Sequence, residues 1–451
     1  MSAARMIHLA FSAHLSGAHP GAWRHPSTED GSDVSIAAYR RLAKIAEAGC
    51  FDMFFMADTP ALRINDLEAW SRYPLFTNVL EPLTALAALS GATEFIGLGG
   101  TATTTFNEPF NVARQFASLD HVSGGRAAWN VVTTANAYAA GNFGPEPLIA
   151  HAARYDRARE FVQLVKKFWN TWEDGAFVYD RPQGRLYDPS KLHPVIHEGE
   201  HFHIRGGLNI ERTPQGHPVI IQAGASDAGK DLAAETAEIV FGSAKTIEAA
   251  RAYYGDLKGR MARYGRAPEE LCLLGGMPVI VGESTQEAED KYQTLQELMH
   301  PVVARQRLSM DLETDLSDLP FDEPIPESRI PAKANFHTAY FAEIVRMIRE
   351  DKLTLIEIAR RYQRGSTTVR GTAKQIADTM EEWFSTGAAD GFMLQLPLQP
   401  EGLADVVRLV VPELQRRGLF RKEYAGRTLR EHLGLRRPPH VPPVRQAQAA
   451  Q

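Results

Sequence analysis

Polar residues follow four apolar segments of the sequence, at the point where each segment ends. Asp58 closes the run FDMFFMAD, Thr101 lies near the end of FIGLGGTAT, Thr134 follows AAWNVVT, and Ala225 and Ser226 follow PVIIQAG. If these segments are neighbouring parallel strands, their carboxyl ends bring the polar groups to one place. Each residue alone also has a structural explanation, since Thr favours strands and Asp caps helices. Together they predict a binding site for a polar ligand.

The segment AGASDAG, residues 223–229, offers a site for an anion. It follows a predicted strand and opens the helical pattern DAGKDLAAETAE, so backbone N–H groups can approach a phosphate at a helix N-terminus. A tight turn with Ser226 as the helix cap requires the same residues, so the motif alone leaves both interpretations open. His151 and Tyr155 share one face of another predicted helix and can supply further donors, or can serve capping and packing.

Other familiar catalytic motifs are absent from the sequence. It contains no GxGxxG, GxxxxGK[ST], GxSxG or HExxH. Cys50 and Cys272 each lie beside an apolar run, and we interpret them as buried free thiols. A polar stretch contains four histidines, which we interpret as structural or surface residues because nothing predicts the convergence that a zinc site needs: His193, His197, His201 and His203. We therefore predict no metal site.

Short apolar runs alternate with amphipathic helical patterns along the chain. A strand followed by a helix, eight times over, predicts a TIM (β/α)8 barrel of the α/β class, with its active site at the carboxyl ends of the strands. The eight runs that resemble buried parallel strands are residues 6–11, 51–58, 95–103, 127–133, 218–224, 238–242, 271–281 and 391–396.

Two stretches are too long for ordinary loops of a barrel. The first, at about residues 136–215, has a helix and then a polar part rich in Pro and Gly. The second, at about 300–371, is acidic and Pro-rich before it becomes helical. Insertions of this size commonly cover the mouth of a barrel, so we interpret both as lid candidates. We assign residues 1–437 to one domain with these insertions, and we expect the Pro-rich tail 438–451 to be poorly ordered.

The bulk composition excludes several classes of protein. A formal charge of −6 and a pI near 6.2 argue against nucleic acid or an anionic membrane as the main partner. No apolar stretch is long enough to span a membrane, and the N-terminus does not have the pattern of a secretion signal. We therefore expect a cytoplasmic protein.

Several long blocks follow one another in an order that one family shares. They are GAWRHP from Gly21, FDMFFMAD from Phe51, EPLTALAALS from Glu81, TATTTFNEPFNVARQFASLDHVSGGRAAWNVVT from Thr101, NFG from Asn142, RYDRAREFV from Arg154, HPVIHEGEHFHIRGGLN from His193, PQGHPVIIQAGAS from Pro214 and VVPELQRRGLFRKEY from Val410. These blocks extend over nearly the whole chain. On them the sequence resembles the nitrilotriacetate monooxygenase, pristinamycin synthase and dibenzothiophene-sulfone monooxygenase group of the bacterial luciferase-like flavin monooxygenases.

The resemblance implies a TIM barrel with insertions that uses FMN as FMNH2, supplied by a separate NAD(P)H-dependent flavin reductase, with O2 as co-substrate. It implies insertion of one oxygen atom into a small organic substrate, with cleavage of a C–N or C–S bond as one outcome. The positions that match FMN contacts of the family are Asp58, Thr101, Thr134, His151, Tyr155, Ala225 and Ser226. Thr134 stands where the family often has Ser, and a short loop after Asp58 makes Thr104 an alternative to Thr101.

Such chemistry needs a proton donor or hydrogen-bond partner near the flavin, and water must be kept out. His19 best matches a family histidine, although packing or capping explains it equally well; His14 and His337 are further candidates. Arg24 and Arg63 are candidates for binding a substrate carboxylate, although solvent-exposed arginines are common.

Two alternative functions stay open on the sequence alone. One is an oxidoreductase of the same superfamily that uses the deazaflavin F420, and the other is a barrel that binds flavin without catalysis. The resemblance also implies a homodimer or homotetramer, and it does not identify the substrate.

Overall fold

Eight parallel strands close into a barrel in the computed structural model, which describes residues 5–134, 136–144, 151–333, 338–362 and 366–443. Their order around the barrel follows the chain, and β13 pairs with both β11 and β1, which closes it. The strands are β1 (His8–Ser12), β2 (Met53–Met56), β3 (Gly97–Thr103), β4 (Ala127–Val132), β9 (Val219–Gln222), β10 (Ile239–Gly242), β11 (Cys272–Val281) and β13 (Gly391–Gln395). The predicted TIM barrel and all eight predicted strands are confirmed.

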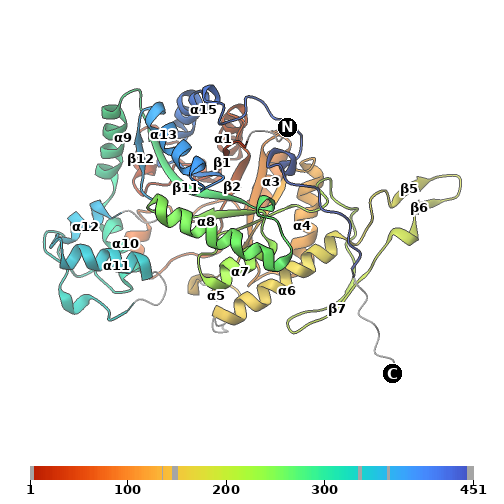
Figure 1. The fold of residues 1–451 in the computed structure, drawn as a ribbon. Coiled ribbons are helices and arrows are strands. Elements are labelled where there is room, and N and C mark those ends of the chain that lie inside the picture. Colours follow the sequence, from red (N-terminus) through yellow and green to blue (C-terminus); the bar gives the residue numbers. More distant parts are fainter. Residues whose placement is uncertain (1–4, 135, 145–150, 334–337, 363–365, 444–451) are drawn as a thin grey trace.

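Helices surround the barrel and return the chain from the end of each strand to the start of the next (Figure 1). Their starts follow ordinary capping rules, with Ser35 and Ser226 as N-caps and Pro82 and Pro109 in first turns. The barrel helices are α1 (Ile36–Ala48), α3 (Pro82–Ser90), α4 (Pro109–Val122), α6 (His151–Trp169), α7 (Asp227–Thr236), α8 (Ile247–Met261), α9 (Thr285–Leu298) and α13 (Ala373–Ser385), followed by α14 (Glu401–Asp405), a π-helical turn (Val406–Val410) and α15 (Val411–Arg416).

Side chains fill the barrel interior, and the C-terminal part of the chain closes the end of the barrel opposite the mouth, which is called the lower end below. Interior residues include Met53, Phe55 and Ile221, all buried. Leu429, in the short helix α16 (Leu429–His432), joins the same apolar cluster, as do other leucines that follow it. The core is therefore complete only when residues 429–435 are in place.

The second insertion forms a small helical unit over the mouth of the barrel (Figure 1). Its helices are α10 (Pro301–Leu312), α11 (Thr338–Arg349) and α12 (Leu355–Arg361), and the short strand β12 (Val369–Gly371) then pairs with the end of β11. Buried residues such as Leu308, Ile344 and Ile358 give this unit an apolar core of its own. Its position agrees with the expectation of a lid.

The expectation that the first insertion covers the mouth is wrong for most of its length. Only its beginning, with α5 (Ala137–Gly141), lies at the mouth, where Asn142 donates to the Pro60 carbonyl at 3.0 Å. Helix α6 then carries the chain to the opposite end of the barrel, where the hairpin β5 (Phe177–Asp180) and β6 (Arg185–Tyr187) lies (Figure 1). The second hairpin, β7 (Val195–Glu198) and β8 (His203–Gly206), packs on α6 through an edge-to-face contact between Phe202 and Phe161. Neither hairpin covers the mouth.

The beginning of the predicted tail lies along this first insertion. Arg437 makes two hydrogen bonds of 2.6 and 2.9 Å to the Asp174 carboxylate, and His440 Nε2 is 2.9 Å from the Asn170 carbonyl oxygen. Residues 444–451 lie outside the described residues. Within the described part of the chain, no helix combines the length and apolar character needed to cross a membrane.

The remaining short helix, α2 (Leu67–Trp70), follows β2 and begins at Asp66, whose side chain accepts from the Ala69 N–H at 3.1 Å. It contacts α10 of the second insertion. The loop after β2 therefore touches the helical unit that covers the mouth.

Candidate functional site

The polar residues at the ends of β2, β3 and β4 form one hydrogen-bonded group at the mouth. Thr101 Oγ1 donates to the Met56 carbonyl at 3.1 Å and accepts from Asn130 Nδ2 at 2.9 Å, which ties three strands together. The Asn130 Oδ1 atom is buried and has no hydrogen-bond partner among the described residues. An unpaired buried acceptor is costly, so this atom is suited to a donor on a ligand.

A second group of hydroxyls lies just beyond the first. Thr134 and Thr103 are joined by a hydrogen bond of 2.8 Å between their hydroxyls. Thr104, the alternative to Thr101, is 1% exposed, and its hydroxyl donates to the Val132 carbonyl at 3.2 Å. Thr101 and Thr103 line a cavity that extends from the ends of β2 and β3 outward between α3 and α4, whereas Thr104 does not line it. This geometry favours Thr101 over Thr104 as a ligand contact.

Asp58 lines the same cavity, together with Glu81 and Phe143. Burial, with added repulsion from Glu81, raises the pKa of Asp58 to about 6, although a hydrogen bond from the Thr59 backbone opposes the rise. Asp58 therefore changes its charge within one unit of neutral pH, and can offer either an acceptor or a donor to a ligand.

The segment after β9 forms a tight cradle at the start of α7. Gly224 and Gly229 approach so closely that a methyl group on Gly224 would lie 2.8 Å from the Gly229 Cα atom. Ser226 caps α7 by accepting from the Gly229 N–H at 3.2 Å. A methyl group on Gly229 would lie 3.1 Å from the Tyr155 hydroxyl and 3.2 Å from the Ser226 hydroxyl. The structure thus brings Tyr155 and Ser226 together, beside an exposed Ala225, at a helix N-terminus suited to an anion.

A tyrosine from the next helix fixes the turn of this cradle. Tyr253, from α8, donates to the Gly224 carbonyl at 2.7 Å, a contact that the sequence did not reveal. His151 begins α6, but its side chain lies outside the described residues. Its contact with the anion site therefore stays a prediction.

His14 and His19 line one cavity on the opposite side of the mouth, next to Tyr73 and Gln395. Burial and the nearby Arg307 guanidinium lower the pKa of His19 to about 3, so its ring is neutral at ordinary pH. His19 Nδ1 accepts from the Gly21 N–H at 3.0 Å, which leaves the ring proton on Nε2. Burial also lowers the pKa of His14. The third candidate, His337, lies outside the described residues.

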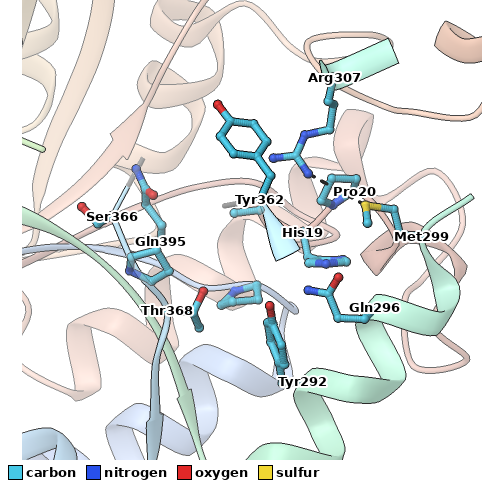
Figure 2. A pocket seen from close by; sticks show the side chains of 13 residues that line it. His19, Pro20, Tyr292, Gln296, Met299, Arg307, Tyr362, Ser366, Thr368 and Gln395 are labelled. Carbon is cyan, nitrogen blue, oxygen red and sulfur yellow. Dashed lines mark hydrogen bonds between the residues drawn. The ribbon is translucent and has the colours of Figure 1, made fainter. Parts of the chain in front are cut away.

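Arg307 reaches the mouth from α10 and was not found from the sequence. Figure 2 shows its side chain directed toward His19 and Pro20, with Tyr362 beside it. No local pattern distinguishes this arginine, because its position depends on how the second insertion folds over the barrel. The two arginines predicted to bind a substrate lie elsewhere: Arg24 is exposed and donates to the Leu298 carbonyl, and Arg63 stacks 5.1 Å from the Trp70 ring.

The four histidines of the polar stretch, His193, His197, His201 and His203, lie away from the mouth. His197 Nε2 pairs with Glu160 at 2.8 Å, and the same carboxylate accepts from the backbone of His201 and Phe202. The exposed His203 pairs with Glu198 at 2.9 Å. These contacts hold the β7–β8 hairpin together and on α6.

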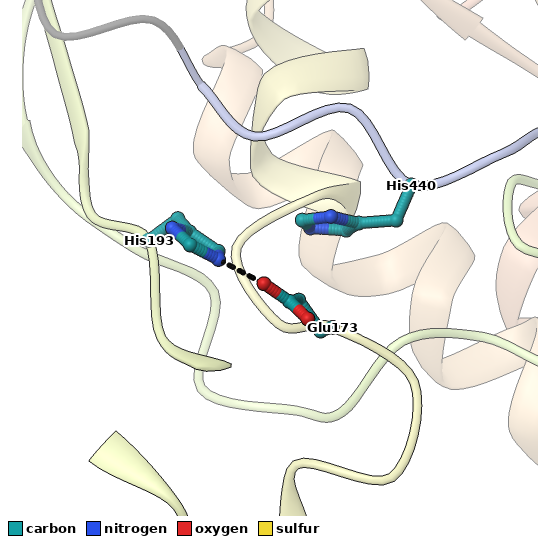
Figure 3. Close-up of side chains that lie close together, drawn as sticks. All are labelled: Glu173, His193 and His440. Atoms are coloured by element: carbon teal, nitrogen blue, oxygen red, sulfur yellow. Dashed lines mark hydrogen bonds and ion pairs between the residues drawn. The ribbon is translucent and has the colours of Figure 1, made fainter. Parts of the chain in front are cut away.

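His193 belongs to the one group among the described residues with metal-ligand geometry. Its Nε2 atom is 2.7 Å from Glu173, and ligand atoms of His193, Glu173 and His440 all lie within 4.8 Å of one another (Figure 3). Because this group lies beside the tail on the first insertion, it has no part in the chemistry at the mouth.

The mouth thus combines a cradle for an anion, a row of hydroxyl and amide groups, a carboxyl group with a raised pKa and a neutral imidazole. Such a set is suited to a ligand with a phosphate at one end and a polar ring at the other. Catalysis by the protein alone has little support here, because the described mouth shows no nucleophile paired with a base.

Comparison with known proteins assigns the family. The model of the luciferase-like monooxygenase family matches residues 13–390. The nitrilotriacetate monooxygenase component A of Aminobacter aminovorans is 46% identical over 97% of this chain and 98% of its own length. The N-acetyl-S-(2-succino)cysteine monooxygenase of Bacillus subtilis (strain 168) is 43% identical over 94% and 95%. The dibenzothiophene-sulfone monooxygenase of Rhodococcus erythropolis (strain XP) is 39% identical over 97% and 98%.

Solved structures agree with this assignment. DmoA from Hyphomicrobium sulfonivorans has a TM-score of 0.84 and 32% identity, covering 95% of this chain and 92% of its own. Riboflavin lyase, solved with a modified FMN and riboflavin, has a TM-score of 0.81 and 30% identity over 95% and 96%. An F420-dependent tetrahydromethanopterin reductase of Methanopyrus kandleri, 14% identical with a TM-score of 0.56 over 90% and 99%, shares the fold alone. The chain therefore belongs to the luciferase-like monooxygenase family, and it is a flavin-dependent monooxygenase.

Proposed function

We propose that this protein is the oxygenase component of a two-component system, which receives FMNH2 from a separate NAD(P)H-dependent flavin reductase. The reduced flavin, when bound, supplies two electrons to O2, so that one oxygen atom enters a small organic substrate and the other leaves as water. The name of the nitrilotriacetate relative supports a divided system, since that enzyme is named as one component of a larger whole.

The observation that carries the proposal is the cradle between Gly224 and Gly229. Two glycine backbones in contact let an anion approach the N-terminus of α7 closely, where Ser226 caps the Gly229 N–H and the Tyr155 hydroxyl lies beside it. We assign the FMN phosphate to this cradle, with Ala225 in backbone contact and His151 as a further donor.

The flavin ring, in this proposal, lies across the ends of β2 to β4. Asp58, Thr101 and Thr134 provide the polar edge that a ring with several nitrogen and oxygen atoms needs. The unpaired Asn130 Oδ1 atom fits a ring N–H at the same place. These residues support a site for the phosphate and the ring of FMN.

His19 is our first candidate for the hydrogen-bond partner of the reacting groups. Its neutral ring presents an N–H at Nε2, and it lines one cavity of the mouth together with His14. The helical unit α10–α12 over the mouth keeps water from the site. His337, from the same insertion, stays a candidate.

The alternatives have weaker support. The F420-dependent reductase shares the fold at 14% identity, whereas the relatives at 39–46% identity are named monooxygenases. A storage barrel has no use for a covered mouth that contains two histidines and an arginine. We infer a homodimer or homotetramer in the cytoplasm, which light scattering and cell fractionation test.

Ser226→Asp tests the phosphate site. Asp caps a helix about as well as Ser, so α7 stays capped, but its carboxylate repels a phosphate in the cradle. We expect the FMN dissociation constant, measured by quenching of Trp fluorescence, to rise by more than about tenfold. The affinity for riboflavin, which has the ring and no phosphate, should change much less.

Ser284→Asp is the matched control, since Ser284 caps α9 by the same contact with a backbone N–H three residues on. It should leave both affinities unchanged. Unaltered FMN binding in the Ser226→Asp variant, with the protein folded, would contradict the proposed site.

The reaction itself is tested with a panel of compounds that the names of the relatives give as substrates, namely nitrilotriacetate, N-acetyl-S-(2-succino)cysteine and dibenzothiophene sulfone. A generic flavin reductase with NADH supplies FMNH2, and mass spectrometry measures the gain of one oxygen atom or the loss of a fragment. Consumption of O2 that yields only hydrogen peroxide with every compound would favour the non-catalytic flavin barrel.

A further inference from the structure

Arg307 has few partners for a guanidinium that lies partly buried at the mouth of the barrel. It donates a hydrogen bond to the Met299 sulfur at 3.8 Å, and a thioether is a weak acceptor. Among the described residues, no carboxylate lies within salt-bridge distance of it. Its donors therefore face the cavities that it lines.

The three arginines that are buried among the described residues are all paired. Arg430 binds both oxygens of Glu238 at 2.6 and 2.8 Å, and Arg212 binds Asp174 at 2.6 Å. Arg126 donates to several backbone carbonyls at 2.6 to 3.0 Å. A guanidinium has five donors and is costly to bury without acceptors. Arg307 thus differs from these arginines in lacking a protein acceptor of comparable strength.

The surroundings of Arg307 favour an incoming anion. The cavity in Figure 2 has no acidic residue among the residues that line it, and its polar members include Gln296 and Gln395. The neighbouring cavity is lined by one acidic residue, Asp33, which makes no salt bridge to Arg307. The positive charge is therefore not neutralised where the two cavities meet.

The geometry points to Arg307 as the residue that binds a carboxylate of the substrate, with the rest of the substrate extending toward His19. Both residues line both cavities, and Arg307 acts on His19 electrostatically. A planar guanidinium binds a carboxylate through two parallel hydrogen bonds, which fixes orientation as well as position. This inference rests on the proposed function, and it adds a substrate class, namely organic carboxylates.

Calorimetric titration of the full-length protein without flavin tests the inference. Nitrilotriacetate and N-acetyl-S-(2-succino)cysteine are the carboxylate probes, and the methyl esters of the same two compounds are neutral controls, all in metal-free buffer. We expect at least one carboxylate probe to bind and its ester to bind at least about tenfold more weakly, as loss of a charge-assisted hydrogen bond predicts.

Arg307→Gln should weaken that binding by about tenfold to a hundredfold, and Arg307→Lys should recover part of it, because Lys keeps the charge without the bidentate geometry. Arg24→Gln and Arg63→Gln are the matched controls and should not change the affinity. Binding of neither carboxylate to the wild type, or equal affinities of wild type and Arg307→Gln, would overturn the inference.

Flavin binding in the same preparations separates this inference from the proposed function. If the wild type binds FMN and oxygenates dibenzothiophene sulfone while neither carboxylate binds, the function stands and the carboxylate site falls. If the carboxylate binds through Arg307 while FMN does not bind, the reverse holds. With a turned-over carboxylate, Arg307→Gln should raise KM more than it lowers kcat, whereas a loss of folding would lower the amount of active enzyme instead.

Discussion

Asp58 is a carboxyl group whose charge depends on where it lies. Its pKa of about 6 is above the ordinary value of 3.8, mainly because burial disfavours the carboxylate. A group with a raised pKa in the folded state contributes stability that is complete below its unfolded pKa. That contribution is lost as the pH rises through the folded value.

The Asp58→Asn variant tests the direction in which the contribution of Asp58 to stability changes with pH. Relative to the variant, the wild type should lose free energy of unfolding as the pH rises from 3.8 to about 6, in urea denaturation at a series of pH values. If Asp58 also contacts FMN, the FMN dissociation constant of the wild type should titrate near pH 6, and that of Asp58→Asn should not. The control is Asp66→Asn, at the start of α2, which should keep the FMN titration. If the FMN dissociation constant of Asp58→Asn still titrated near pH 6, the contact between Asp58 and FMN would be excluded.

Single residues also show what the sequence could not reveal. Asp58, Thr101 and Ser226 were found because each follows an apolar run, and the end of a strand is a local signal. Arg307 has no such signal, because α10 buries polar residues such as Gln306 and Asp311 as well as apolar ones, and its position over the mouth depends on long-range packing. Thr104 was an alternative in sequence; both hydroxyls donate to a backbone carbonyl, and Thr101 differs in that it lines the cavity.

The turn between β9 and α7 is the element on which the cofactor assignment depends. In Gly229→Ala, the added methyl group would lie 2.9 Å from the Gly224 Cα atom, so the turn must open. We expect FMN affinity to fall by on the order of tenfold, as when a hydrogen bond to a charged group is lost.

Gly255→Ala provides a control in another helix. Gly255 lies in α8 with nothing within 4 Å of the added methyl group, and Ala in a helix is more stable than Gly by roughly 0.5–1 kcal/mol. This variant should keep FMN affinity and gain thermal stability. Equal FMN affinities of Gly229→Ala and wild type would show that the cradle does not hold the phosphate.

The elements of the barrel were predictable, because continuous apolar runs mark strands that are buried on both faces. The position of the first insertion was predicted wrongly for its two hairpins. The helix that precedes them was predicted, and a barrel helix always returns the chain to the end opposite the mouth. The residues that follow this helix therefore had to lie at the end opposite the mouth. The order of the elements, rather than the length of the insertion, could have predicted the position of the two hairpins.

The whole molecule is tied together at the lower end of the barrel by an ion-pair network. Asp52, 1% exposed, lies 3.1 Å from His8 Nδ1, accepts from the Leu9 N–H at 2.7 Å and pairs with Arg421. Burial disfavours the charged His8 ring, but Asp52 and the Cys272 sulfur together outweigh this and raise the pKa of His8 to about 10. The network joins β1, β2 and the C-terminal part of the chain.

Asp52→Asn should cost about 3–5 kcal/mol in the free energy of unfolding, because it leaves the charge of Arg421 without its partner. The stabilisation from His8 is complete below pH 6.5 and is lost as the pH rises through about 10. The difference between wild type and variant should therefore shrink over that range. Glu29→Gln, which breaks the exposed pair with Arg41, should cost less than about 1 kcal/mol. Similar losses in the two variants would show that burial of the network has no special effect.

The closure of the lower end by residues 429–435 has a consequence for how the protein is made. Strand β1 can complete its pairing only with β13, and the barrel interior is filled only when Leu429, Leu433 and Leu435 pack into it. While these last residues are still inside the ribosome, the earlier strands have no complete sheet and no filled interior. Maturation of the barrel must therefore wait until residues 429–435 have left the ribosome.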